Sequence, residues 1–118
     1  MTVDARELLG RYKMPHGDEV ELQDAIAEIL DKHTVGYSRE LRLNRADRID
    51  FLLYDGTGLE VKVDGTAPAL IRQLHRYAQH PSVTSLVVVT TRARLSALPG
   101  ELNGKRISVV SLLGGALL

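Results

Sequence analysis

The chain has 118 residues, 44% of them apolar, and its 15 Lys and Arg residues balance its 15 Asp and Glu residues. This length fits one domain spanning residues 1–118 and is too short for two. The sequence contains no Cys, which excludes disulfide scaffolds, thiol catalysis and cysteine-based metal centres. Its apolar runs are too short to span a membrane and its N-terminal region lacks an apolar signal-peptide core, so we expect a cytoplasmic protein with no membrane partner.

Two helices are predicted in the first third of the chain. Residues 1–17 are interpreted as an N-terminal arm, in which capping signals predict a short helix from about Asp4 to Tyr12. A long helix is predicted over Glu19–Lys32, because apolar residues recur there with a period of 3.6. Gly36 ends this segment. Because its apolar residues share one face, the long helix is expected to cover a core.

Three strands are predicted in the middle of the chain. Tyr37–Leu43 is polar and fits an edge strand, whereas Arg48–Tyr54 alternates between two faces. Leu59–Val63 also alternates, with its apolar residues on one face and Glu60 and Lys62 on the other. The alternation in the second strand places on one face the residues Ile49, Phe51 and Leu53.

The turn between the last two of these strands decides which side chains share a face. Asp55-Gly56-Thr57-Gly58 is a turn signal with two residues able to adopt a positive φ. In an antiparallel pair, Asp50 and Glu60 share a face only if the loop has an odd number of residues. We therefore predict a three-residue loop, Gly56–Gly58, with Gly58 in the left-handed conformation.

The second half of the chain predicts a parallel crossover. Thr66 caps a helix that ends at about Gln79, and Ser85–Thr90 is a continuous apolar strand typical of a sheet covered on both faces. A loop or short helix over Arg92–Asn103 leads to a last strand, Ile107–Leu113. The predicted fold class is therefore α/β, with a mixed β-sheet flanked by helices.

Two carboxylates and one ammonium group gather on the predicted hairpin. Asp50 and Glu60 are expected on one face of it, with Lys62 two residues farther along the same strand. Two close carboxylates repel one another unless a cation neutralises them. Their oxygens suit Mg²⁺ or Mn²⁺, and a lysine beside them can orient a water molecule or neutralise charge on a phosphate. The pattern favours metal-assisted phosphodiester chemistry.

Here the sequence resembles the PD-(D/E)XK nuclease superfamily. Arg48-Ile49-Asp50 and Glu60-Val61-Lys62 are similar to its two strand motifs, with Ile49 in place of the motif's proline. The predicted element order is similar to the superfamily's αβββαβ core, a restriction-endonuclease-like fold, over about residues 19–91. The resemblance implies that Asp50, Glu60 and the backbone carbonyl of Val61 bind Mg²⁺ (or Mn²⁺), with Lys62 as a catalytic residue.

The resemblance also implies a metal-binding glutamate on the first long helix. Glu21 is our choice for this catalytic and metal-binding residue, because the acid of the superfamily lies near the start of that helix. A second interpretation is structural, since Asp18 and Glu21 have the spacing of a capping box. Glu28, one heptad later on the same edge of the helix, is the alternative acid.

Side chains on the second long helix are candidate DNA-binding residues. Gln73 and Tyr77 share a helix face and are similar to a Gln-x-x-x-Tyr pattern of the RecB-like exonuclease branch, where these residues line the active-site groove. Tyr77 also fits the buried face of the helix. Arg72 and Arg76 are placed to grip a phosphodiester backbone. A local positive patch is further expected from Arg39, Arg42, Arg45 and Arg48, which otherwise fit a solvated edge strand.

These features together predict a Mg²⁺-dependent deoxyribonuclease acting in recombination, repair or phage DNA processing. The small domain implies DNA as partner and either a homodimer or a helicase or recombination protein beside it. A phage-type exonuclease is favoured over a Holliday-junction resolvase. Two alternatives stay open, a catalytically inactive nuclease fold that binds DNA or protein, and an unrelated α/β interaction domain in which the three charged residues form a surface ion pair.

Overall fold

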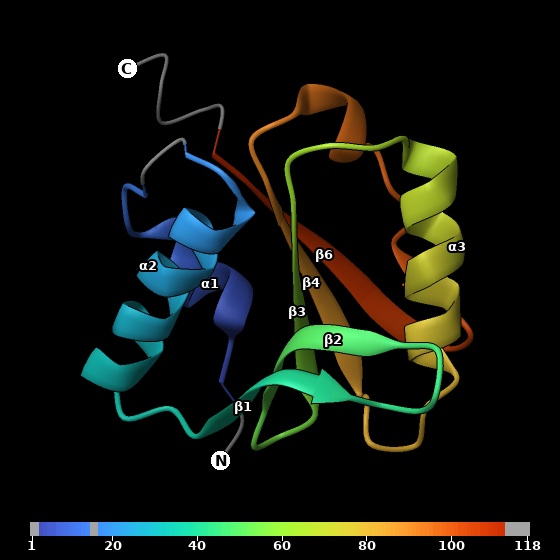
Figure 1. Ribbon diagram of the computed structural model, residues 1–118, viewed down its shortest axis with the longest axis horizontal. Helices are drawn as coiled ribbons and strands as arrows, with labels where there is room; N and C mark the ends of the chain where they lie inside the picture. Colours follow the sequence, from blue (N-terminus) through green and yellow to red (C-terminus); the bar gives the residue numbers. More distant parts are fainter. Residues whose placement is uncertain (1–2, 15–16, 113–118) are drawn as a thin grey trace.

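A computed structural model of the protein describes residues 3–14 and 17–112, in which helices cover both faces of one β-sheet (Figure 1). The last residue of the predicted final strand, Leu113, lies outside these ranges. No helix in the described part of the chain is long and apolar enough to cross a membrane. The elements are α1 (Ala5–Gly10), α2 (Glu19–Lys32), β1 (Tyr37–Arg42), β2 (Arg48–Leu53), β3 (Thr57–Lys62), α3 (Ala67–Ala78), β4 (Ser85–Thr90), the 3₁₀ turn η1 (Ala93–Leu95), β5 (Glu101–Leu102) and β6 (Lys105–Ser111).

Within the described residues the sheet has six strands, in the order β1-β2-β3-β4-β6-β5. The first three strands are antiparallel neighbours, and β3, β4 and β6 run parallel. This arrangement confirms the prediction of an α/β domain with a mixed sheet flanked by helices. The short strand β5 was not predicted, because a strand of two residues has no alternating pattern. It pairs with β6 across a tight turn in which Asn103 and Gly104 both have positive φ.

The helices divide the core into two parts, one on each face of the sheet. On one face, α1 and α2 cover the apolar side of β3, and on the other face α3 covers β4 (Figure 1). The predicted caps are present, since the Asp18 and Thr66 side chains accept hydrogen bonds from the first turns of α2 and α3. The N-terminal segment is part of this packing, because α1 buries Ala5, Leu8 and Leu9.

The hairpin between β2 and β3 has the predicted parity but a different register. Its loop also has three residues, Tyr54–Gly56, and Gly56 rather than Gly58 has the positive φ, at 90°. Gly58 lies inside β3, where it pairs with Leu52. The predicted position of the loop was therefore wrong by two residues, although an odd loop length still brings Asp50 opposite Glu60.

Gly58 is a glycine because side chains from both neighbouring strands, β2 and β4, fill the space next to its Cα. A Cβ atom there would lie 2.5 Å from Ile49 Cδ1 and 2.8 Å from Leu86 Cδ2, both in the core beneath α3. We expect Gly58→Ala to lower the free energy of unfolding by about 1–3 kcal/mol, because the packed neighbours must shift. Chemical denaturation measures this change. Gly100→Ala is the matched control, since a Cβ at Gly100 meets no atom within 4 Å, and an equal loss in both variants would contradict the packing argument.

In both β1 and β2 the alternating side chains switch to the other face of the sheet at the position where Glu40 lies opposite Asp50. Ile49 packs in the core beneath α3, whereas Phe51 and Leu53 pack in the core beneath α2, so the prediction that these three residues share a face was wrong. The ladder of β1 and β2 lacks this one pair, and Glu40 has a φ of 51°. Like charges directly opposite each other disfavour a regular pair at this position. The irregular pairing leaves the Asp50 side chain free to turn toward β3.

Candidate active site

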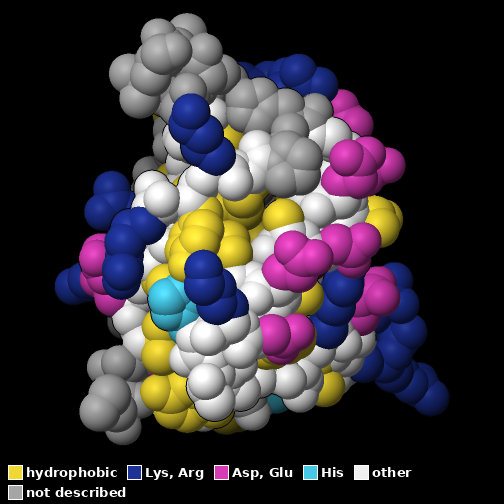
Figure 2. Space-filling model, turned by 90° about the vertical axis from the view of Figure 1, so that its left-hand side faces the viewer, with side chains coloured by type: hydrophobic (Ala, Val, Ile, Leu, Met, Phe, Trp, Pro, Cys, Tyr) yellow, Lys and Arg dark blue, Asp and Glu magenta, His cyan; other side chains and the backbone are white. Residues whose placement is uncertain are grey.

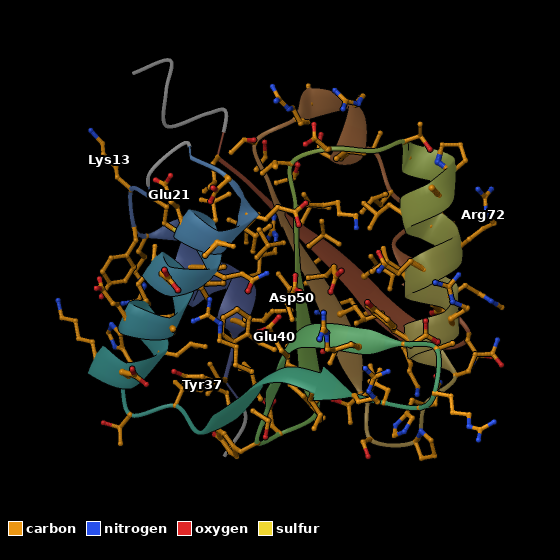
Figure 3. All side chains as sticks on the ribbon, in the orientation of Figure 1. Lys13, Glu21, Tyr37, Glu40, Asp50 and Arg72 are labelled. Atoms are coloured by element: carbon orange, nitrogen blue, oxygen red, sulfur yellow. The ribbon has the colours of Figure 1, made fainter. Side chains whose placement is uncertain are left out.

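Each of the two carboxylates of the hairpin accepts a backbone N–H of the other strand at the point where β2 and β3 separate. Regular pairing of these strands runs only as far as Phe51 and Leu59. Beyond it, the Asp50 N–H donates to Glu60 Oε1 at 3.3 Å, and the Val61 N–H donates to Asp50 Oδ2 at 2.8 Å. Figure 3 shows Asp50 in the middle of the molecule, between the helix layers, with Glu40 beside it. Each carboxylate is thus fixed by the backbone of the neighbouring strand.

The opening between the strands also receives a backbone carbonyl. In an extended strand the N–H and C=O of one residue point to the same edge. Because the Val61 N–H points toward Asp50, the Val61 carbonyl faces the same opening. The sequence-predicted set of Asp50, Glu60 and the Val61 carbonyl is therefore brought together.

Burial and mutual repulsion make the ionised pair unfavourable. Glu60 is 4% exposed, and burial, followed by the charge of Asp50, raises the pKa of its carboxyl from 4.5 to about 8. Burial also raises the pKa of Asp50, against the opposing effect of the Val61 N–H. The positive charge of Lys62 lowers the pKa of both groups. The site favours a bound positive charge or a bound proton.

Tyr77 and Gln73 of α3 hold the buried end of Glu60. The Tyr77 hydroxyl lies 2.9 Å from the Arg48 carbonyl oxygen and 3.4 Å from Glu60 Oε2, and Gln73 Nε2 donates to it at 2.9 Å. One phenolic proton cannot serve both oxygens, so a protonated Glu60 completes the network by donating to the phenol oxygen. The two interpretations of Tyr77 are compatible, because its ring is buried in the core while its hydroxyl reaches the site.

Removal of that hydroxyl tests the network. We expect Tyr77→Phe to lower the free energy of unfolding by about 1–3 kcal/mol, because buried Glu60 and partly buried groups of Arg48 and Gln73 lose a hydrogen bond. Tyr37→Phe is the control, since its hydroxyl donates to Asp31 at an exposed position and its loss is expected to cost less than about 1 kcal/mol. Urea denaturation of both variants measures the difference, and similar losses would show that the hydroxyl of Tyr77 has no special role.

Glu19, which sequence reasoning missed, is the acid of α2 that approaches the pair. Its Oε1 accepts the Val63 N–H at 3.2 Å, and its charge raises the pKa of both Asp50 and Glu60. Glu21 is exposed and folds over Gly17, away from Asp50 (Figure 3), and Glu28 is also exposed. The structure brings neither Glu21 nor Glu28 to the site. Glu19 and Glu21 both lie in the first turn of α2, so the sequence could indicate only that an acid near the start of this helix approaches the site. Tertiary packing decides which of the two it is.

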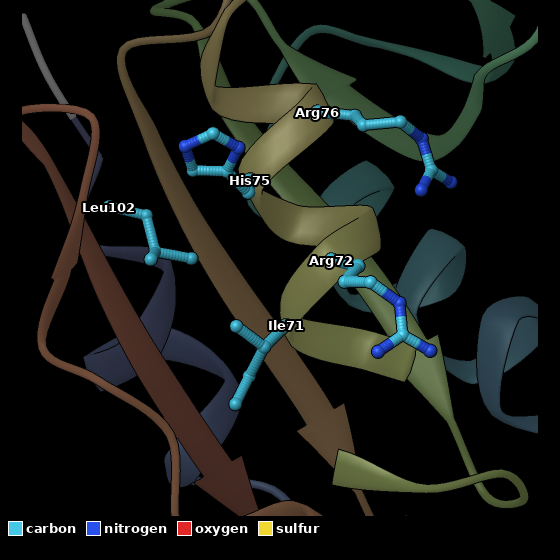
Figure 4. Close-up of a pocket in the computed structure, with 5 residues that line it drawn as sticks. All are labelled: Ile71, Arg72, His75, Arg76 and Leu102. Carbon is cyan, nitrogen blue, oxygen red and sulfur yellow. The ribbon is translucent and has the colours of Figure 1, made fainter. Parts of the chain in front are cut away.

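A cationic hollow adjoins Lys62 along α3. This open cavity of about 350 Å³ is lined by Lys62, Gly65, Arg72, Gln73 and Arg76, among others. Arg76 also pairs at 3.0 Å with a buried aspartate, which fixes it in place. Figure 4 shows the guanidinium groups of Arg72 and Arg76 extending away from a second, mainly apolar hollow on α3. The structure therefore brings Gln73, Arg72 and Arg76 to the neighbourhood of the site.

The other predicted DNA-binding arginines occupy different positions. Arg39 donates to Asp24 at 2.8 Å and lies over the Phe51 ring, so it belongs to the packing between β1 and α2. Arg48 has an exposed side chain beside the site, and its carbonyl accepts from Tyr77. On the side that carries α1 and α2, acidic and basic side chains are interspersed (Figure 2). The cationic hollow beside the site takes its positive charge from α3 and the end of β3.

The described residues contain no group of three or more acidic, His or Cys side chains arranged to hold a metal ion. The nearest approach to such a group is the Asp50 and Glu60 pair with Glu19 beside it. Mg²⁺ usually takes one or two protein carboxylates and fills its remaining positions with water and substrate oxygens. No protein-family model, no curated protein and no solved structure matches this chain.

Proposed function

We propose that this protein is a divalent-metal-dependent nuclease that hydrolyses phosphodiester bonds in DNA. One observation supports the proposal above all others, namely the pair formed by buried Glu60 and half-buried Asp50 in the opening between β2 and β3, with the charge of Lys62 lowering the pKa of both. A protein has little reason to bury two carboxylates together for stability, because each disfavours the ionisation of the other. Perturbed acids beside a cationic hollow are typical of a catalytic site.

The residues present fit a hard divalent cation. Asp50 and Glu60 offer carboxylate oxygens and Val61 offers a carbonyl oxygen, which are the ligand types that Mg²⁺ and Mn²⁺ prefer. Glu19 lies beside them, since its Oε1 accepts the Val63 N–H and its charge raises the pKa of both acids. The raised pKa of Glu60 has the sign expected of a carboxylate that awaits a cation, since binding of the cation would restore its charge.

Each residue then has a defined part in hydrolysis. When bound, the metal lowers the pKa of a water molecule and neutralises charge on the phosphate. Lys62 positions the attacking water oxygen and stabilises the charge that develops on the phosphate oxygens. Tyr77 and Gln73 hold Glu60 in place from behind. The water oxygen gives up a proton to solvent and forms a new bond to phosphorus, the bond from phosphorus to the leaving oxygen breaks, and the leaving oxygen takes up a proton from solvent.

Nuclease assays test this proposal directly. Linear, nicked, single-stranded and four-way-junction DNA are incubated with the protein and Mg²⁺ or Mn²⁺, with EDTA as the negative control. We expect cleavage that requires the metal and disappears in Lys62→Ala, and the preferred substrate separates an exonuclease from a junction resolvase. Cleavage that survives in both Lys62→Ala and Asp50→Asn would contradict the proposed site. DNA binding without cleavage of any substrate would instead favour an inactive nuclease fold that acts as a binding module.

A further inference from the structure

Two arginines near the start of η1 are anchored to the loop that follows the site. Arg92 Nε donates to the Val63 carbonyl at 2.8 Å, and Arg94 Nε donates to the Gly65 carbonyl at 3.1 Å. The Thr90 side chain, which is buried, accepts the Arg92 backbone N–H at 3.0 Å and so fixes the chain between β4 and η1. Both arginines are therefore held at their Nε atoms in a fixed relation to the end of β3.

The outer nitrogens of these arginines remain available. A guanidinium group has five N–H donors, and the bonds to Val63 and Gly65 use only the Nε–H of each arginine. Both residues are exposed, and within residues 3–14 and 17–112 no ion pair engages either one, including with Asp64 of the same loop. A guanidinium that is fixed at Nε presents its two terminal nitrogens as a fork, which matches the oxygens of a phosphate group.

Their anchors place them at the edge of the candidate active site. Val63 directly follows Lys62, and its N–H donates to Glu19, so its two backbone groups join the acid of α2 to Arg92. Gly65, which anchors Arg94, lines the cationic hollow that also contains Lys62. Both arginines are thus tied to the chain that directly follows β3, and Arg94 is tied to a residue that lines the hollow.

From this arrangement we infer that Arg92 and Arg94 bind phosphate groups of the nucleic-acid strand next to the bond that is cleaved. This inference rests on the proposed function, because it names the part of the substrate that lies beyond the reacting phosphate. The ligand is the phosphodiester backbone rather than the bases, since a fixed guanidinium fork recognises phosphate oxygens in any sequence. Binding at this position is accordingly independent of sequence and sensitive to salt.

The salt dependence of binding tests the inference in the full-length protein. Fluorescence anisotropy with a labelled single-stranded oligonucleotide is measured in EDTA, between about 50 and 200 mM salt. We expect the double variant Arg92→Ala/Arg94→Ala to bind about tenfold more weakly at low salt and to lose about one unit from the slope of log affinity against log salt. The variant Arg92→Lys/Arg94→Lys keeps both charges and is expected to recover most of the slope.

Arg6→Ala is the matched control. Arg6 also donates from Nε to a backbone carbonyl, that of Val109, but on the opposite side of the sheet, and its removal is expected to leave the slope unchanged. A wild-type slope in the double alanine variant would overturn the inference while leaving the nuclease proposal intact if the wild-type protein cleaves DNA. Weaker binding with an unchanged slope would also overturn it, because the arginines would then act only on loop structure. A wild-type protein that binds a polyglutamate peptide but neither binds nor cleaves DNA would overturn both proposals.

Discussion

Replacement of Asp50 by asparagine is expected to lower metal-dependent DNA cleavage about a thousandfold without lowering the stability of the fold. The variant loses the negative charge that holds the cation, and electrostatic stabilisation by a bound metal is worth several kcal/mol in the transition state. A loss of about 4 kcal/mol corresponds to about a thousandfold in rate. Single-turnover cleavage of the preferred DNA substrate, at saturating protein and Mg²⁺, measures this effect.

The same substitution is not expected to lower the free energy of unfolding. The asparagine side-chain oxygen can still accept the Val61 N–H, as Asp50 does at 2.8 Å. The charge of Asp50 raises the pKa of Glu60, so a neutral side chain removes that repulsion from the folded state. The free energy of unfolding at neutral pH, in EDTA, is therefore expected to be equal to that of the wild-type protein or higher.

A carboxylate outside the site provides the control for both measurements. Glu101 is exposed on β5, at the far edge of the sheet from β2, and Glu101→Gln is expected to change neither cleavage nor stability measurably. Loss of cleavage in Asp50→Asn together with loss of stability would show that the residue supports the fold rather than the chemistry. Full cleavage by Asp50→Asn would exclude Asp50 as a metal-binding residue.

The elements of this fold were predictable because short-range signals determine them. Asp18 and Thr66 cap α2 and α3 where the sequence places them, and α2 has the predicted bounds of Glu19–Lys32. The apolar run Ser85–Thr90 forms the parallel strand that its continuous hydrophobicity indicates. The prediction of a loop with an odd number of residues was also correct. Side-chain parity depends on the number of residues in the loop and not on where the loop begins.

The details of the site depend on packing that no local pattern contains. Two glutamates in the first turn of α2 are equivalent in sequence, but the angle between α2 and β3 directs Glu19 to the Val63 N–H. The reversal of β2 at Asp50 depends on its partner Glu40, which has a left-handed φ. Strict alternation therefore predicted the wrong face for Ile49, even though it placed Asp50 and Glu60 opposite each other.

Glu60 is expected to make the stability of the metal-free protein depend on pH. The pKa of its carboxyl is raised from 4.5 to about 8 on folding, so the folded state favours the protonated acid. Below pH 4.5 the acid is protonated in both states, and the group imposes no penalty. As pH rises from 4.5 to about 8, the unfolded chain releases its proton more readily than the folded protein does, and the free energy of unfolding falls.

Urea denaturation in EDTA, at a series of pH values across this window, measures the fall. In Glu60→Gln the side chain cannot ionise, so the decline is expected to be much smaller, whereas Glu101→Gln should behave as the wild-type protein does. Added Mg²⁺ should reduce the decline in the wild-type protein, because a cation between Asp50 and Glu60 stabilises both carboxylates in their charged form. If wild-type stability is constant across the window, Glu60 is ionised in the folded protein without a metal. The buried pair would then need another source of positive charge, and Lys62 is the nearest candidate, because its charge already lowers the pKa of both acids.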